Sequence, residues 1–236
     1  NNPSEILTIQ TVPDYFYVIN GETSPWGRIR ECNDVIEGVT GSATLSKEEK
    51  ELLLGQAHFF RAWRYYLLVK MYGGVPIVDH VQNPVIGDGN GENLVIPRSS
   101  TKDCVKFICD DLDLAASYLP ARWPNDGQDY GRITSGAALA LKGRTLLLYA
   151  SPLFNRADNT ERWKDASDAA AELKKQGYEL YEDYGKLFLN RRAKPVANNE
   201  SVIEFGYVYE TLDYSFDYFN CPPSDGGYAE ISPTET

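Results

Sequence analysis

The sequence predicts an all-α protein whose helices form pairs, with long loops and minor β structure. Apolar residues recur at spacings of three and four in five stretches between residues 26 and 177, which is the period of amphipathic helices. Capping residues precede these stretches, and Gly or Pro ends most of them. A loop of about nine residues joins the last two stretches, and such a loop permits an antiparallel helical pair.

The first predicted helix runs from about Trp26 to Val39. Pro25 is tolerated at a helix start because the N–H that it lacks would have no partner there, and Ser24 can cap the first turn. Gly41 marks the end of the helix. Helical spacing gives an expected buried stripe that consists of Ile29, Cys32, Ile36 and Val39.

The second predicted helix is the longest and runs from Lys47 to Tyr72. Ser46 and Glu49 stand three apart ahead of an apolar run, which is the pattern of a capping box. The helix is apolar around most of its girth, so we expect it to be buried between partners. Its expected main face consists of Leu53, Ala57, Phe60, Arg64, Leu67 and Met71, and Leu54, Phe59, Trp63 and Tyr66 broaden that face.

A short extended piece at 77–81 and a loop at 82–98 follow. Within this loop, 87–93 is similar to a calcium-binding loop but lacks the Gly and the Glu that such loops require at positions six and twelve, so we interpret it as a solvated loop. Thr101 is the expected cap of a helix that ends at Leu119. Its expected seam consists of Val105, Cys109, Leu112, Ala116 and Leu119, while Asp110, Asp111 and Asp113 are interpreted as solvated residues of an ordinary amphipathic helix.

Two further helices are predicted, one at 136–150 and one from a Thr160 cap to Gly177. The first is rich in Ala and Gly, and small residues let a neighbouring helix that carries Trp163 pack closely. From residue 178 the period changes, and 200–209 alternates between apolar and polar residues as a strand does.

Charge and motif content exclude several functions. The chain has 23 basic and 34 acidic residues, for a net charge of -11, and this field repels nucleic acid because no basic patch offsets it. The sequence contains no run of eighteen apolar residues, so we predict no membrane-spanning helix. The four cysteines, Cys32, Cys104, Cys109 and Cys221, form no C-x-x-C pair, and no catalytic motif occurs. We therefore predict no catalytic residue, cofactor or metal.

The segment Gln56–Pro76, with its Gln-Ala-His-Phe-Phe-Arg-Ala start and Tyr-Gly-Gly-Val-Pro end, resembles the corresponding helix of SusD/RagB-like outer-membrane nutrient-binding lipoproteins. Four further stretches resemble the same family in the same order. They are Ile29–Asn33, Asp110–Pro120, Gly131–Asn155 and Tyr178–Glu204. The resemblance covers nearly all of residues 26–205.

The resemblance implies a tetratricopeptide-like scaffold that faces a SusC-like TonB-dependent porin and holds an oligosaccharide, starch-like in class, at the bacterial cell surface. It implies a Bacteroidetes-type polysaccharide-utilization protein of the outer membrane, anchored by an N-terminal lipid that this chain lacks. On this reading 1–236 is a single helical domain, the N-terminal part of a longer protein, and 206–236 begins a loop-rich ligand region.

Candidate ligand residues follow from the chemistry of sugar binding, which needs flat aromatic faces for C–H groups and polar side chains for hydroxyls. The chain has sixteen Tyr and four Trp. The resemblance places glycan contacts in loops near both ends of the chain. The predicted ligand residues are Trp26, Tyr207, Tyr209, Tyr214, Asp217, Tyr218 and Tyr228.

Two alternatives remain open. A tetratricopeptide-type module would bind a protein or peptide, through a groove lined by Asn, Arg and Lys rather than by exposed rings. A glycoside hydrolase would need two carboxyl groups about 5 to 9 Å apart across a cleft, a separation that sequence does not reveal.

Overall fold

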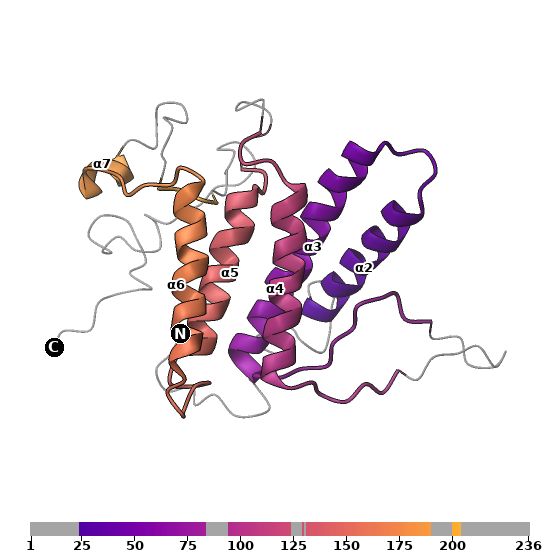
Figure 1. Cartoon of the computed structure of the whole chain (residues 1–236). Coiled ribbons are helices and arrows are strands. Elements are labelled where there is room, and N and C mark those ends of the chain that lie inside the picture. The colour runs from indigo at the N-terminus through magenta and orange to yellow at the C-terminus, as the bar shows by residue number, and fades with distance from the viewer. Residues whose placement is uncertain (1–23, 84–93, 124–128, 130, 190–199, 204–236) are drawn as a thin grey trace, which may run out of the picture.

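The computed structural model describes residues 24–83, 94–123, 129, 131–189 and 200–203. In this part of the chain the elements are α2 (Pro25–Gly41), α3 (Lys47–Tyr72), α4 (Thr101–Tyr118), α5 (Ser135–Ala150), α6 (Thr160–Lys175) and α7 (Tyr184–Leu189). Each of the five long helices packs against the next in chain order, and α3 also touches α5 (Figure 1). The predicted all-α class is confirmed.

The five predicted helices are present, and α5 and α6 form the expected hairpin (Figure 1). Ser24 and Ser46 cap α2 and α3 as predicted, the latter with a complete capping box. Two predicted caps were wrong by one residue, because Ser100 Oγ and Asn159 Oδ1 accept the first-turn N–H bonds in α4 and α6. The short α7 was not predicted.

The predicted β structure is not seen in the part of the chain that the structure describes, which contains no strand. Residues 77–81 run as a loop. This loop is fastened to helices by side chains rather than to a neighbouring strand. Most of the alternating segment 200–209 lies outside the described residues.

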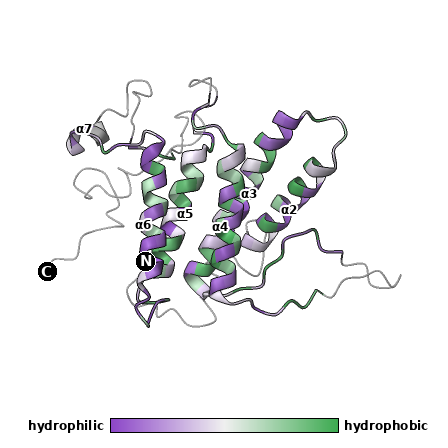
Figure 2. Cartoon of the chain, viewed as in Figure 1, coloured by the Kyte–Doolittle hydropathy of each residue, from purple (hydrophilic) through white to green (hydrophobic). Residues whose placement is uncertain are grey.

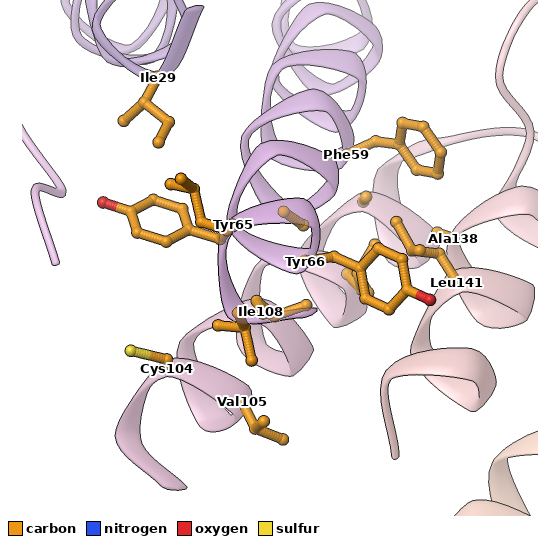
Figure 3. Packing of buried hydrophobic residues seen from close by; sticks show 14 of the residues in the cluster. Ile29, Phe59, Tyr65, Tyr66, Cys104, Val105, Ile108, Ala138 and Leu141 are labelled. Carbon is orange, nitrogen blue, oxygen red and sulfur yellow. The ribbon is translucent and has the colours of Figure 1, made fainter. Parts of the chain in front are cut away.

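The core lies where α3 meets its neighbours. Figure 3 shows Tyr65 and Tyr66 of α3 extending to opposite sides of the helix, with Ile108 of α4 below them. Tyr65 is fully buried and meets the ring of Phe107 edge-on at 5.0 Å between centroids. In Figure 2 the long helices carry both hydrophobic and hydrophilic residues, as amphipathic helices do. Tyr65 and Tyr66 belong to the core, and Trp63 packs against it.

The predicted main face of α3 was wrong in its direction. Leu53, Phe60 and Met71 are 40%, 46% and 44% exposed. Ala57 of the predicted face is buried and Leu67 packs against the core. The other side chains that α3 buries lie mainly outside that face, and they include His58, Phe59, Arg61, Ala62, Tyr65, Tyr66, Leu68 and Val69. Because α3 is apolar around most of its girth, the period alone does not say which sector faces the neighbouring helices.

The cap of α6 gives a direct test of the helix start. Replacing Asn159 by Ala removes the acceptor for the Glu161 N–H, which lies 3.0 Å away. We expect Asn159→Ala to lower the free energy of unfolding by about 1 kcal/mol. Thr160→Ala is the matched control, since Thr160 is the first helical residue, and we expect a change within about 0.5 kcal/mol. Urea denaturation of both variants measures the difference, and equal losses would contradict this cap assignment.

Candidate functional site

A buried polar cluster of Asn33, His58, Arg61 and Asp111 joins α2, α3 and α4. Arg61 binds Asp111 in a bidentate manner, with Nε donating to Oδ2 at 2.8 Å and Nη2 to Oδ1 at 2.7 Å. His58 Nδ1 lies 2.7 Å from the same Oδ1. Arg61 Nη1 also donates to Asn33 Oδ1 at 2.8 Å. All four side chains are buried, so the charges meet each other rather than water.

The polar cluster fastens the loop that follows α3. Arg61 Nη1 donates to the Asp79 carbonyl at 3.0 Å. Asn33 Nδ2 donates to the carbonyls of Val78 and His80 at 3.1 and 2.9 Å. These bonds satisfy backbone oxygens that a loop packed on three helices would otherwise leave without partners. The cluster therefore supplies side-chain partners to the backbone of the extended piece that was predicted at 77–81.

The chemistry of this cluster is that of a structural ion pair. Burial works against the charge of Arg61, but the hydrogen bond to Asp111 and the charge of that carboxylate raise the pKa of the guanidinium. Both Asp111 oxygens already accept hydrogen bonds from Arg61, which leaves this carboxylate poorly placed to exchange a proton with a substrate. The cluster is thus explained by its role in holding the loop.

The prediction that Asp111 is solvated was wrong. Its neighbours Asp110 and Asp113 are exposed and pair with Lys106 and Lys142. Asp111 instead lies on the buried seam of α4, together with Cys104, Ile108 and Ala115. The spacing 104, 108, 111, 115 is itself a helical stripe, and an acid within it was the signal for a buried partner.

The predicted ligand residues fall into two groups. Trp26 is half-buried in the first turn of α2, and its ring meets Tyr65 edge-on at 6.2 Å between centroids. It packs against the hydrophobic core, as a structural aromatic residue does. The other six, Tyr207, Tyr209, Tyr214, Asp217, Tyr218 and Tyr228, lie outside the described residues.

A surface depression, which we call the α4–α6 hollow, lies where the first turns of α4 and α6 meet the end of α5, at the lower edge of Figure 1. Its volume is about 540 Å³. The hollow is lined by Thr101, Lys102, Tyr149, Leu153, Phe154, Asn155, Arg156, Ala157, Asn159 and Arg162. Sequence reasoning missed it, because residues near 101 and near 156 come together only in the folded chain.

The described residues hold no group of three or more His, Cys, Asp or Glu side chains placed to bind a metal ion. Cys32, Cys104 and Cys109 are free thiols there, while Cys221 and the loop at 87–93 lie outside the described residues. No helix within the described ranges is long and apolar enough to cross a membrane.

Stacked helices that are joined by a buried polar cluster are typical of a helical scaffold protein. The family model described as "Starch-binding associating with outer membrane", a SusD-like family, matches residues 5–147. The chain therefore belongs to the SusD-like family, as the resemblance predicted. This is a family of carbohydrate-binding proteins associated with the outer membrane.

Solved structures share the fold. A SusD-like protein from Bacteroides fragilis is 33% identical, with a TM-score of 0.62, and covers 84% of this chain and 34% of its own. A SusD-like carbohydrate binding protein from Bacteroides fragilis has a TM-score of 0.67 at 23% identity and covers 87% and 36%. A third structure, described as containing a xylogluco-oligosaccharide, has a TM-score of 0.58 at 23% identity and covers 78% and 34%. The chain spans about a third of the length of these relatives.

Proposed function

We propose that this chain is the N-terminal part of a non-catalytic surface protein that binds an oligosaccharide and delivers it to a SusC-like TonB-dependent transporter. The observation that carries this proposal is the match of the SusD-like family model to residues 5–147. The same helical fold occurs in a protein whose structure contains a xylogluco-oligosaccharide. The protein would be an outer-membrane lipoprotein held by an N-terminal lipid.

The described helices would supply a rigid frame for this function. The polar cluster fastens the loop after α3 to α2 and α3, which gives ligand-binding loops a supported frame. Stacking on rings and hydrogen bonds to hydroxyls would come from Tyr207, Tyr209, Tyr214, Asp217, Tyr218 and Tyr228, in the region 206–236, with Trp26 as a further candidate. Within the domain 1–236, the stacking contacts would thus come from the loops of 206–236, and the helices would hold those loops in place.

The proposal is tested by passing the chain, and its full-length parent, over a panel of neutral oligosaccharides from starch, xyloglucan and mannan. We expect saturable quenching of Tyr and Trp fluorescence by one glycan class and no release of reducing ends. Release of reducing ends would make the protein a glycoside hydrolase. Co-purification of the parent with a TonB-dependent porin tests the delivery step.

The ligand residues are tested by Tyr214→Ala combined with Tyr218→Ala. Loss of two stacking rings should weaken glycan binding at least about tenfold, since truncation of an aromatic anchor at a binding site commonly costs more than 1 kcal/mol. Tyr184→Ala is the matched control, because Tyr184 is 76% exposed and is not a candidate ligand residue. Titration of each variant with the glycan found above measures the effect, and equal affinities would remove these two residues from the site.

A peptide-binding module is the second candidate, and the exposed apolar side chains of α3 favour it. Leu53, Phe60 and Met71 stand at helical spacing on one sector of α3, and amphipathic peptides commonly bind such surfaces. Binding of a peptide library, with no glycan bound by the chain or the parent, would support this function over the first.

A further inference from the structure

We propose that the α4–α6 hollow binds the anionic group of an acidic saccharide, either the carboxylate of a hexuronic acid or a sulfate ester. The inference rests on the proposed glycan-binding function and goes beyond it by naming a second site and the class of ligand that this site would bind. The hollow is distinct from the predicted ligand residues in 206–236. It is built entirely from residues that the structure describes.

The charge of the hollow is opposite to that of the whole chain. Lys102, Arg156 and Arg162 are among its ten lining residues, and no Asp or Glu is, although the chain carries a net charge of -11. Three acids, Asp103, Asp158 and Glu161, are next to lining residues in the sequence but do not line the hollow themselves. Asp103 accepts a hydrogen bond from Ser100 Oγ at 2.6 Å. Cations gathered at one depression attract an anion, and the concave wall increases that attraction.

Two of the three cations are free to bind a ligand. Among the described residues, Lys102 and Arg156 are exposed and form no ion pair with a protein carboxylate. Other exposed lysines on the same helices do form such pairs, as Lys106 does with Asp110 and Lys164 with Asp168. Within the described ranges, Lys102 and Arg156 therefore lack the carboxylate partners that those lysines have.

The third cation is fixed in place. The Arg162 guanidinium lies over the ring of Tyr149, with Cζ 3.9 Å from the centroid. Its Nη1 donates to the carbonyl of Phe154 at 2.7 Å. Buried Asn155 holds the turn beneath, since its Nδ2 donates to the Ala150 and Asn159 carbonyls and its Oδ1 accepts from Asn159 N at 2.9 Å. A wall that is already ordered lowers the entropic cost of binding.

Apolar surface beside the cations favours a saccharide over an inorganic anion. Leu153 is exposed, and Phe154 and Tyr149 are half-buried in the same wall. Such surface suits the C–H faces of a sugar ring, while the guanidinium of Arg156 can bind a carboxylate or sulfate through two parallel hydrogen bonds. The hollow has a volume of about 540 Å³ and is open to solvent, so a saccharide would lie against its wall rather than be enclosed by it.

The test is calorimetric titration of the full chain at low ionic strength, where surface charges are least screened. The probes are trigalacturonate, a carrageenan tetrasaccharide that carries only sulfate, neutral maltotriose and inorganic sulfate. The test variant combines Lys102→Gln with Arg156→Gln. Its matched control combines Lys174→Gln with Lys175→Gln, which makes the same change in net charge at the far end of α6.

We expect one acidic probe to bind the unmodified chain at least about tenfold more tightly than it binds the test variant, while the control changes by less than about twofold. Binding of trigalacturonate would identify a carboxylate ligand, and binding of the carrageenan tetrasaccharide would identify a sulfate ester. Equal weakening in the two variants, or displacement of the acidic saccharide by equimolar inorganic sulfate, would overturn the inference. Binding of neutral glycans alone would reject it and leave the proposed function standing. No binding of any glycan, by the chain or its parent, would reject both.

Discussion

Replacing Arg61 by Met should lower the free energy of unfolding by about 3–5 kcal/mol, which is the cost of leaving a buried charge without its partner. The substitution keeps a long side chain in α3 but removes both hydrogen bonds to the Asp111 carboxylate. It also removes the donor that reaches the Asp79 carbonyl. A domain of this kind has a total stability of about 5–15 kcal/mol, so a large share of that stability would be lost.

Urea denaturation followed by circular dichroism measures this effect, and Lys142→Met is the matched control. Lys142 joins α5 to Asp113 of α4, but that carboxylate is about half exposed, so the pair should contribute at most about 1 kcal/mol. Hydrogen exchange offers a second readout, because the Val78 N–H, which donates to Tyr65 Oη, should exchange faster in Arg61→Met. A loss no larger than that of the control would contradict the structural role of the cluster.

Replacing Gly74 by Ala should destabilise the protein by about 3 kcal/mol, the upper part of the usual cost of forcing an atom into a packed site. A Cβ at Gly74 would lie 2.0 Å from the Ser99 carbonyl oxygen and 3.0 Å from Thr101 N. Because the Ser99 oxygen and the Thr101 nitrogen are backbone atoms, no change of side-chain rotamer can relieve these contacts. The segment that leads into α4 would have to move away from the end of α3.

The consequence of that movement is a loss of the bonds between these two segments. Ser99 N donates to the Val75 carbonyl at 3.1 Å, and Arg98 Nε donates to the Gly74 carbonyl at 2.7 Å. Gly38→Ala is the matched control, since a Cβ there meets nothing within 4 Å. In the interior of α2 that change should stabilise the protein by about 0.5–1 kcal/mol. Thermal denaturation compares the two variants. A Gly74→Ala variant as stable as the unmodified chain would show that the end of α3 and the segment that leads into α4 can separate freely.

The helices could be predicted because their determinants are close in the sequence. Ser46 and Glu49 form the capping box of α3, and both lie within the first turn. Gly73, with a φ of 71°, ends the same helix in a conformation that favours glycine. The errors at Thr101 and Thr160 were single-residue shifts, because two adjacent residues could each supply a capping oxygen.

The candidate site was predictable only in part. The family resemblance rests on local motifs in five stretches between residues 29 and 204, and the family-model match to residues 5–147 confirmed the family. The resemblance names the aromatic residues of 206–236 as ligand contacts, and these stay predictions. Trp26 could not be assigned from sequence, because a tryptophan in the first turn of a helix serves equally as a ligand platform or, as its contact with Tyr65 shows, as packing.

Local sequence signals were enough to place the five long helices to within about two residues at each end, to identify the capping box of α3 and to assign the family. The packing of the helices against one another decided which sector of α3 is buried, which acid of α4 pairs with Arg61, and that Lys102 and Arg156 line the same hollow. The reason is physical. Helix signals act within one turn, whereas Arg61 and Asp111 are 50 residues apart and Arg61 and Asn33 are 28 apart, so their pairing depends on how three helices pack rather than on any local pattern.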